Sequence, residues 1–294
     1  MSWPTVRLTL RLRMASTASA AFGLLAVLVA VGALFPAVGH TIGKLTVPAG
    51  VAQLLGGADY GTITGWFRSE IGSVYGPLVI GALAVTGASA ATAGEEESRL
   101  LALVLAQPIA RSRLIVAKAA AIAGAVLTIA VASWIGLLVG VAVGGGGISV
   151  AHITAFAVQL AFFGFAAGAL AIALGAATGR HALATGVAAA VLVLGWLVNG
   201  FAPLVGAVAW LKYLSLFHYY AGNDPLTRGV DVGGLIVLGA LAVMLTALAV
   251  GTFERARPSR VDAVLIAGAS TASSRSFPAW YVFDHHDDAM LDVR

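Results

Sequence analysis

The sequence predicts an all-α, polytopic membrane protein with six transmembrane helices. Of its 294 residues, 60% are hydrophobic and only 10% are charged, whereas soluble domains carry about a quarter charged residues. A helix needs about 20 apolar residues to cross a bilayer. Stretches without Asp, Glu, Lys or Arg occupy residues 14–43, 71–94, 119–179, 181–211 and 232–253. Composition therefore argues against a soluble globular fold.

The stretch 119–179 is too long for one span and contains four consecutive glycines, Gly144 to Gly147. A glycine run weakens a helix and suits a turn, so we divide the stretch there. The six expected spans are then 18–36, 71–93, 115–142, 152–177, 183–201 and 232–253.

The distribution of lysine and arginine predicts the topology, because cytoplasmic loops are enriched in both. One side would carry Arg7, Arg11, Arg13, Arg99, Arg111, Arg113, Lys118, Arg180, Arg255, Arg257 and Arg260. The other side would carry only Lys44, Arg68, Lys212 and Arg228. We expect a multi-pass protein of the plasma membrane with both termini, the 94–118 segment and the Arg180 loop in the cytoplasm.

Three regions follow from this division. Residues 1–17 are expected to form an N-terminal interfacial helix: the alternation over 6–13 alone favours a strand, but an open strand edge is unfavourable at a membrane. Residues 18–255 form the six-span domain. Residues 256–294 are expected to be a flexible cytoplasmic tail whose cluster Asp284 to Asp288 lacks a fixed metal-ligand geometry.

Several kinds of chemistry have no support in the sequence. There is no cysteine, no convergence of acids, bases and nucleophiles, and no basic block interleaved with aromatics, so we expect no catalytic residues, no metal site and no nucleic-acid partner. The segment Gly39 to Lys44 is one residue too short for a phosphate-binding loop. We therefore expect no cofactor in this chain. The spans carry no ionisable residue away from their ends, which disfavours ion coupling.

Residues 94–118 form the densely charged stretch between two spans. Glu95, Glu96 and Glu97 would occupy a first helical turn, where the helix dipole favours them. An apolar stripe follows, and Pro108 then marks a break. The stripe consists of Leu100, Leu103, Val104 and Gln107. A connector on the lipid surface is one reading, but the anionic cytoplasmic leaflet repels three glutamates. A protein partner with a groove is favoured.

Two further segments, 37–70 and 202–231, are expected on the opposite side. Trp66 and Phe67 beside Arg68 and Glu70 suit a membrane surface. In 202–231 the aromatic residues form either an interfacial belt or an outer gate. The gate candidates are Tyr213, Phe217, Tyr219 and Tyr220.

The sequence from Glu95 through a leucine-rich helix to Gln107-Pro108-Ile109-Ala110-Arg111-Ser112-Arg113 and Lys118 resembles the permease subunits of ABC-2 type ABC transporters. In these permeases the stretch commonly reads E…G-T-L-x-L-L-L-[AS]-x-P-[IV]-S-R…K and forms the coupling helix. This chain has Ser98-Arg99-Leu100 where Gly-Thr-Leu is common, and Ala110 where Ser is common. The outer segment Tyr213 to Tyr220, with Asp224-Pro225-Leu226 and Gly229, is similar to that of the drug-efflux members.

The resemblance implies a six-span permease half that pairs with a second permease subunit, identical or related, and with ATP-binding subunits that hold ATP and magnesium. The coupling helix would then comprise Glu95, Glu96, Glu97, Arg99, Leu100, Leu103, Val104, Gln107, Pro108 and Arg111. The expected function is ATP-driven export of a hydrophobic or amphipathic molecule such as a drug, antibiotic or lipid. An ion-coupled secondary carrier and a non-transporting assembly or immunity protein remain the alternatives.

Overall fold

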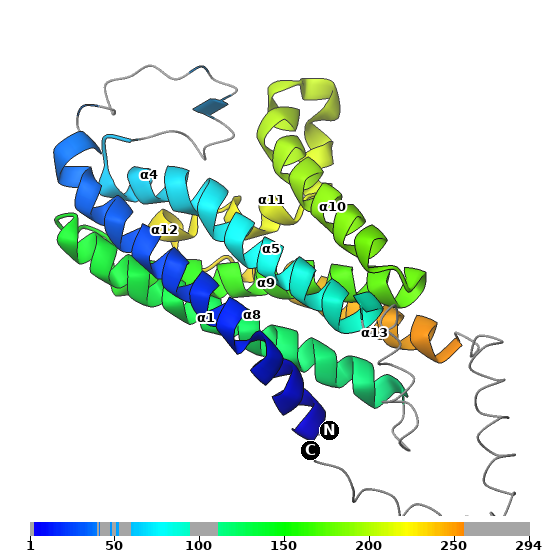
Figure 1. Ribbon diagram of the computed structural model, residues 1–294. Helices are drawn as coiled ribbons and strands as arrows, with labels where there is room; N and C mark the ends of the chain where they lie inside the picture. Colours follow the sequence, from blue (N-terminus) through cyan, green and yellow to red (C-terminus); the bar gives the residue numbers. More distant parts are fainter. Residues whose placement is uncertain are drawn as a thin grey trace, which may run out of the picture. The chain divides into compact units, whose positions relative to one another are not determined.

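A computed structural model describes residues 3–39, 60–94 and 111–255, together with isolated positions 41, 48, 51 and 52. The chain divides into two units, Met1–Arg255 and Ala256–Arg294. The second unit, which holds the expected tail, lies outside the described residues. The described part of the first unit is helical, as Figure 1 shows.

Six helices in the described residues are long and apolar enough to cross a membrane, which confirms the all-α, six-span prediction. They cover Met14–Gly39, Ile63–Thr92, Ser112–Val143, Val150–Thr178, His181–Leu204 and Val232–Thr252. Five of the six expected spans agree with these bounds to within about four residues. The second helix begins earlier than expected.

The first helix, α1 (Trp3–Leu34), runs without a break through the expected interfacial segment and continues as η1 (Phe35–Gly39), a π-helical turn. It packs along α8 (Arg111–Val143), and the two helices form the most extensive contact between elements in the described residues. Glycine makes this possible, because a Cβ added at Gly32 would overlap the backbone of Gly140. Small residues let helix backbones approach closely where packing drives association in lipid.

The second helix combines α4 (Ile63–Phe67), η2 (Arg68–Tyr75), α5 (Gly76–Ser89) and η3 (Ala90–Gly94). It begins eight residues before the expected start at Ile71, because the Thr62 hydroxyl accepts a hydrogen bond from the Gly65 N–H and caps the helix. Arg68 and Glu70 therefore lie inside this helix. η2 and η3 are π-helical, and π-helical turns occur frequently at functional sites.

The four-glycine run forms the turn that we predicted between α8 and α9 (Val150–Thr178). Gly145, Gly146 and Gly147 have φ values of 104°, 79° and 111°, a conformation that glycine adopts readily. Ser149 then caps α9 by accepting the His152 N–H. At the other end Gly179, with φ 61°, terminates the helix.

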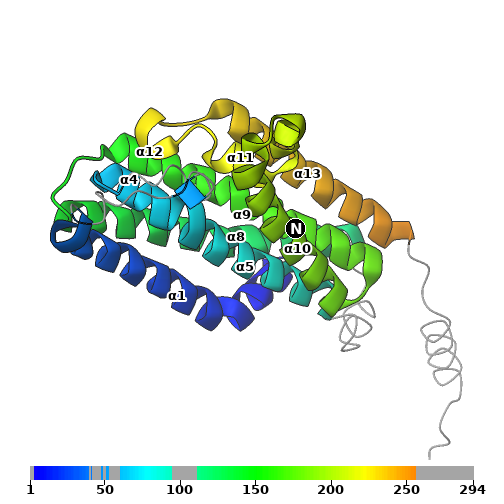
Figure 2. The ribbon, with the colours of Figure 1, turned by 90° about the horizontal axis from the view of Figure 1, so that it is seen from above.

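α9 lies at the centre of the bundle and contacts α5, α8, α10 (His181–Phe201) and α13 (Val232–Arg255). In Figure 2, α1 and α13 lie on opposite sides of α9. The most hydrophobic window of α9 is 61% buried, against 11% in α10 and 17% in α13. α10 and α13 therefore expose apolar surfaces to lipid or to another subunit.

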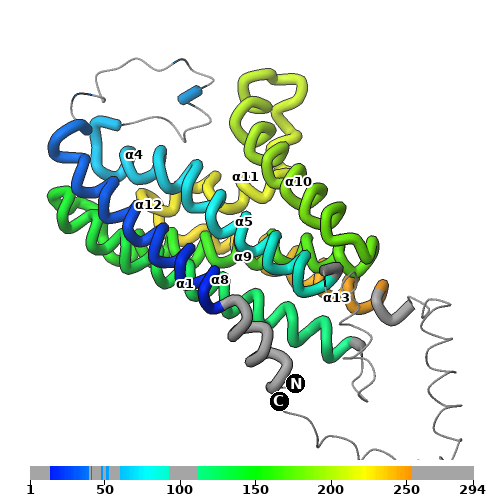
Figure 3. Tube along the Cα trace, in the orientation of Figure 1, coloured from blue at the N-terminus to red at the C-terminus, as the bar shows by residue number. Residues whose placement is uncertain are grey.

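The 202–231 segment connects α10 to α13 and is built from four short helices. These are η4 (Ala202–Leu204) and η5 (Gly206–Leu214), both 3₁₀, and α11 (Leu216–Ala221) and α12 (Pro225–Arg228). Figure 3 follows the chain from α10 into this segment and back toward α11. α11 packs on α9, α10 and α13, so the segment returns to the bundle.

Candidate functional site

The expected coupling segment falls between η3 and α8, at residues 95–110, which lie outside the described residues. Glu95 to Pro108 are therefore not placed by the structure, and Arg111 is placed only as the first residue of α8. η3, which leads into the segment, contacts α8, α9 and α10. The segment is thus attached at the end of the bundle where α9 turns into α10.

Lys118, the last residue of the coupling-helix motif, is described, and its side chain is only 2% exposed within α8. A lysine this deep between apolar helices is unusual. The motif therefore enters the third spanning helix and does not end at the surface.

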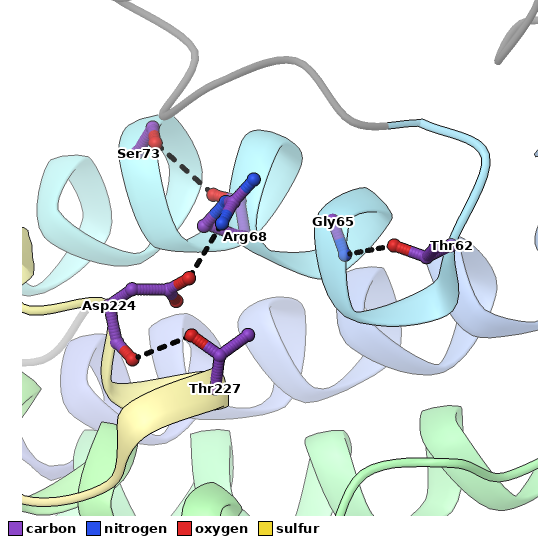
Figure 4. Close-up of polar contacts among 6 residues, drawn as sticks. All are labelled: Thr62, Gly65, Arg68, Ser73, Asp224 and Thr227. Carbon is purple, nitrogen blue, oxygen red and sulfur yellow. Dashed lines mark hydrogen bonds and ion pairs between the residues drawn. The ribbon is translucent and has the colours of Figure 1, made fainter.

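At the opposite end, an ion pair joins the second helix to the 202–231 segment. Arg68 Nη1 donates to Asp224 Oδ2 at 2.6 Å, as Figure 4 shows. The two side chains are 26% and 18% exposed. Asp224 reaches this position from a left-handed backbone conformation with φ 50°, which aspartate tolerates better than most residues. This pairing allows Arg68 to lie within a spanning helix.

A second polar contact joins the same helix to α10. The indole Nε1 of Trp196 donates to the carbonyl of Ser73 at 3.1 Å. Pro77 is four residues further along and has no N–H, so it cannot satisfy that carbonyl at the usual helical spacing. The Ser73 hydroxyl in turn donates to the Arg68 carbonyl at 3.2 Å. The π-helical stretch thus presents backbone and side-chain polar groups toward α10 and the 202–231 segment.

A third contact folds the 202–231 segment back over α10. Ser215 Oγ donates to the Gly195 carbonyl at 2.7 Å and accepts from the Phe217 N–H at 3.1 Å. Serine at this point therefore both caps α11 and holds it against α10. Because Gly195 and Trp196 are adjacent, the second and third contacts lie side by side on α10.

These contacts border an open cavity of about 380 Å³ between η2, α9, α10 and the 202–231 segment, which we call the polar cavity because charged side chains line it. Its ionisable lining residues are Arg68, Lys212, His218 and Asp224. Its aromatic lining residues are Phe156, Trp196, Phe217 and Tyr220. A volume of this size is in the range of small-molecule sites.

A second cavity of about 340 Å³ lies between α5 and α10 and is apolar. Its lining includes Pro77, Leu78, Val85, Leu192 and Val193. Thr86 also lines it, but its hydroxyl donates to the Ala82 carbonyl at 2.7 Å, which satisfies the polar group within its own helix. The two cavities share three lining residues: Ser73, Trp196 and Phe217.

The electrostatics of the polar cavity follow from burial. Desolvation lowers the pKa of His218, with the nearby Lys212 acting in the same direction and Asp231 opposing it. The ring is therefore neutral at pH 7. Tyr220 is 1% exposed, and burial raises the pKa of its hydroxyl well above the ordinary value.

Of the four gate candidates, Phe217 and Tyr220 line the polar cavity, and Phe217 also lines the apolar one. Tyr213 and Tyr219 line neither: the Tyr219 hydroxyl donates to the Tyr213 carbonyl at 2.8 Å, and both rings contact His218 edge-on. Sequence reasoning missed Arg68, Ser73 and Trp196. An isolated arginine beside a charge-free stretch is the signal that could have indicated Arg68.

A family model described as the multidrug efflux system permease Rv1217c, C-terminal domain, matches residues 4–254. This chain belongs to that family. The match covers all six spanning helices, both cavities and the undescribed segment 95–110. A comparison with curated proteins finds no match.

Family membership makes the chain an ABC permease domain of a multidrug efflux system, and hence a multi-pass membrane protein that takes part in transport. An efflux permease of this kind implies partners from an ABC system. Within residues 14–39, 60–92 and 112–252, no three His, Cys, Asp or Glu side chains are grouped so that they could hold a metal ion.

Proposed function

We propose that this chain is the membrane-spanning subunit of an ATP-driven exporter of hydrophobic or amphipathic molecules. The observation that carries the proposal is the family match across all six spanning helices. Two permease subunits, identical or related, would work with two ATP-binding subunits that hold ATP and magnesium. The ligand-sized cavities between α5, α10 and the 202–231 segment support a transport role over a structural one.

In this proposal the segment from Glu95 to Pro108, which includes Arg99, forms with Arg111 the coupling helix that docks into the ATP-binding subunit. ATP binding would shift the permease between inward-facing and outward-facing states, because ATP prefers the closed form of its own subunit. Attachment of the segment directly to η3 and α8 supports this assignment, since movement of the segment would act on two spanning helices at once.

The docking assignment is tested with Leu103→Glu, which places a charge on the apolar stripe. The matched control is Ala102→Glu, which adds the same charge on the opposite face of the same helix. A tagged chain is isolated in gentle detergent and assayed for bound ATPase. We expect Ala102→Glu and the unmodified chain to recover ATPase, and Leu103→Glu to lose it.

Equal recovery of ATPase with both variants would contradict docking through this stripe, but it would still support an ATP-driven transporter. A chain that is recovered alone under several mild detergents would contradict the ATP-driven proposal and favour a secondary carrier or an interaction protein. Dependence of transport on an ion gradient would then separate these two alternatives.

We also propose that both termini, with the tail at 256–294, lie in the cytoplasm of the plasma membrane. The chain contains no cysteine, so single cysteines report topology without background. An impermeant maleimide applied to intact cells should label Val230→Cys and leave Arg180→Cys unlabelled. Val230 is exposed between α12 and α13, and Arg180 is exposed between α9 and α10. The reverse pattern would overturn this orientation.

A further inference from the structure

The two cavities meet at one wall of the second helix and α10. Ser73, Trp196 and Phe217 line both, and the Trp196–Ser73 hydrogen bond lies in this wall. A molecule that occupies both cavities must therefore be polar at one end and apolar at the other. The geometry also places the polar end against the 202–231 segment and the apolar end between α5 and α10.

The apolar cavity fits a single hydrocarbon chain. Along the second helix it extends from Ser73 in η2 to Thr86 in α5, about 20 Å of helix, and along α10 from Thr185 to Trp196, about 17 Å. Its rim is open, since Leu78 is 60% exposed and Val193 is 54% exposed. A volume of about 340 Å³ is at the small end of ligand sites, which favours one chain over two.

The charge of the polar cavity favours an anionic head. Arg68 and Asp224 pair with each other and offset each other, and His218 is neutral at pH 7 for the reason given above. This leaves Lys212, which makes no ion pair among the described residues and lies with Nζ 5.1 Å from the Tyr213 ring centroid. Asp231 is not part of the lining, and its carboxylate accepts the Gly234 N–H at the start of α13.

Two buried polar groups at the cavity also lack a hydrogen-bond partner among the described residues: Arg68 Nε and the Tyr220 hydroxyl. The Tyr220 side chain is 1% exposed, and an unsatisfied buried polar group costs about 1–3 kcal/mol. Both groups can donate to an anionic oxygen. Asp224 Oδ1 is unpartnered as well, and the paired Arg68 offsets the charge of this carboxylate, so that Lys212 remains available to an anionic head.

We propose that the two adjacent cavities together bind a single-chain amphiphile with a carboxylate or phosphate head, the head near Lys212 and Tyr220 and the chain between α5 and α10. The statement that this ligand is the substrate of the permease rests on the proposed exporter function. Binding itself requires only this chain. An experiment can therefore refute ligand binding without refuting ATP-driven export, and the reverse.

The test measures binding to the purified full chain in nanodiscs of zwitterionic lipid, without an ATPase. The probes are 6-bromododecanoate, 6-bromododecyl phosphate and 6-bromododecyltrimethylammonium, whose bromine lies on the part of the chain near the head and therefore beside the wall that contains Trp196. Bromine quenches the fluorescence of a nearby tryptophan. Trp196 lines both cavities, and the Trp196→Phe variant defines the quenching that comes from it. We expect both anionic probes to quench Trp196 and to bind about tenfold more tightly than the cationic probe.

Lys212→Gln should weaken binding of the anionic probes about tenfold, and Lys212→Arg should retain it. The matched control is Arg228→Gln, an exposed cation of the same segment that does not line the cavity. Ala189→Phe should block the apolar cavity and abolish quenching of Trp196. Its control is Ala190→Phe, an exposed neighbour on α10 that lies outside the lining.

Equal or tighter binding of the cationic probe would overturn the proposal, as would unchanged binding in Lys212→Gln or equal effects of the two alanine substitutions. A preference for the carboxylate or for the phosphate probe would identify the head within the proposed class. Loss of ATPase recovery in the docking experiment would leave this result standing. ATP-dependent efflux without binding of anionic probes would refute only the present inference.

Discussion

Breaking the Arg68–Asp224 ion pair should destabilise the packing of the 202–231 segment against the second helix. The perturbation is a double-mutant cycle of Arg68→Gln and Asp224→Asn. Asparagine tolerates the left-handed backbone of position 224, so this substitution removes the charge without adding backbone strain. The measured quantity is the free energy of unfolding of the purified chain in mixed micelles, from denaturant titration.

The expected magnitude follows from the exposure of the pair. Fully exposed pairs contribute about 0.2–1 kcal/mol, and removal of one partner of a fully buried pair costs about 3–5 kcal/mol. At 26% and 18% exposure the two side chains lie between these cases, so each single substitution should cost about 2 kcal/mol. The double substitution should cost less than the sum, leaving a coupling energy of about 1.5 kcal/mol.

The control is Arg228→Gln, which removes an exposed charge from α12 and should change stability by no more than about 0.5 kcal/mol. A coupling energy below about 0.5 kcal/mol in the cycle would refute the argument. It would mean that each charge is solvated separately and that the segment is held by its apolar contacts alone.

Three further predictions concern the packing and titration of the bundle. Gly140→Val should cost about 1–3 kcal/mol of unfolding free energy because a Cβ there meets the backbone of α1, whereas Gly23→Ala, with nothing within 4 Å, should be tolerated; denaturant unfolding measures both. Trp196→Phe should cost about 1 kcal/mol in the same assay, since the Ser73 carbonyl loses its indole donor while the ring volume is largely kept. The melting temperature should fall more steeply below pH 6.5 in the unmodified chain than in His218→Gln: the pKa of His218 is lowered by folding from its ordinary 6.5, so protonation favours the unfolded state, and a parallel pH dependence would argue against this.

The six spanning helices could be predicted because each rests on local composition. A run of apolar residues must be helical in a bilayer to satisfy its backbone. The division at Gly144 to Gly147 was also local, and the positive φ angles of Gly145, Gly146 and Gly147 are the physical reason that the division was right. Membership in an ABC permease family was indicated by the motif from Glu95 to Lys118 and by the outer segment from Tyr213 to Gly229, and the family match confirms it.

The predicted start of the second helix, at Ile71, is too late because the cost of a charge in a spanning helix depends on its ion-pair partner, which the local sequence does not reveal. Arg68 and Glu70 were read as surface residues, so the span was begun at Ile71. The structure pairs Arg68 with Asp224, which is 156 residues away in the chain. No pattern around Arg68 reports this partner, and only the folded arrangement removes the cost of its charge.

For the aromatic gate candidates too, composition indicated the segment but not which of its side chains line a cavity. Four aromatic residues in Tyr213 to Tyr220 were selected together, yet only Phe217 and Tyr220 line the polar cavity. Ser215 ends the 3₁₀ helix η5 and begins the α-helix α11, so the helical period changes at this residue. A prediction that assumes one helical period for the whole segment cannot tell which aromatic side chains line the cavity and which lie at the surface.

The polar contacts near the 202–231 segment share one cause in the sequence, the irregular stretch from Arg68 to Pro77. A regular helix would satisfy its own carbonyls and leave nothing for α10 to bind. Here Pro77 lacks the N–H that would reach the Ser73 carbonyl at α-helical spacing, and that carbonyl accepts a hydrogen bond from Trp196 on α10, a helix that is otherwise weakly buried. The same stretch supplies Arg68 to Asp224. An interruption in one spanning helix thus provides the attachment points for α10 and for the 202–231 segment, and the polar cavity lies between them.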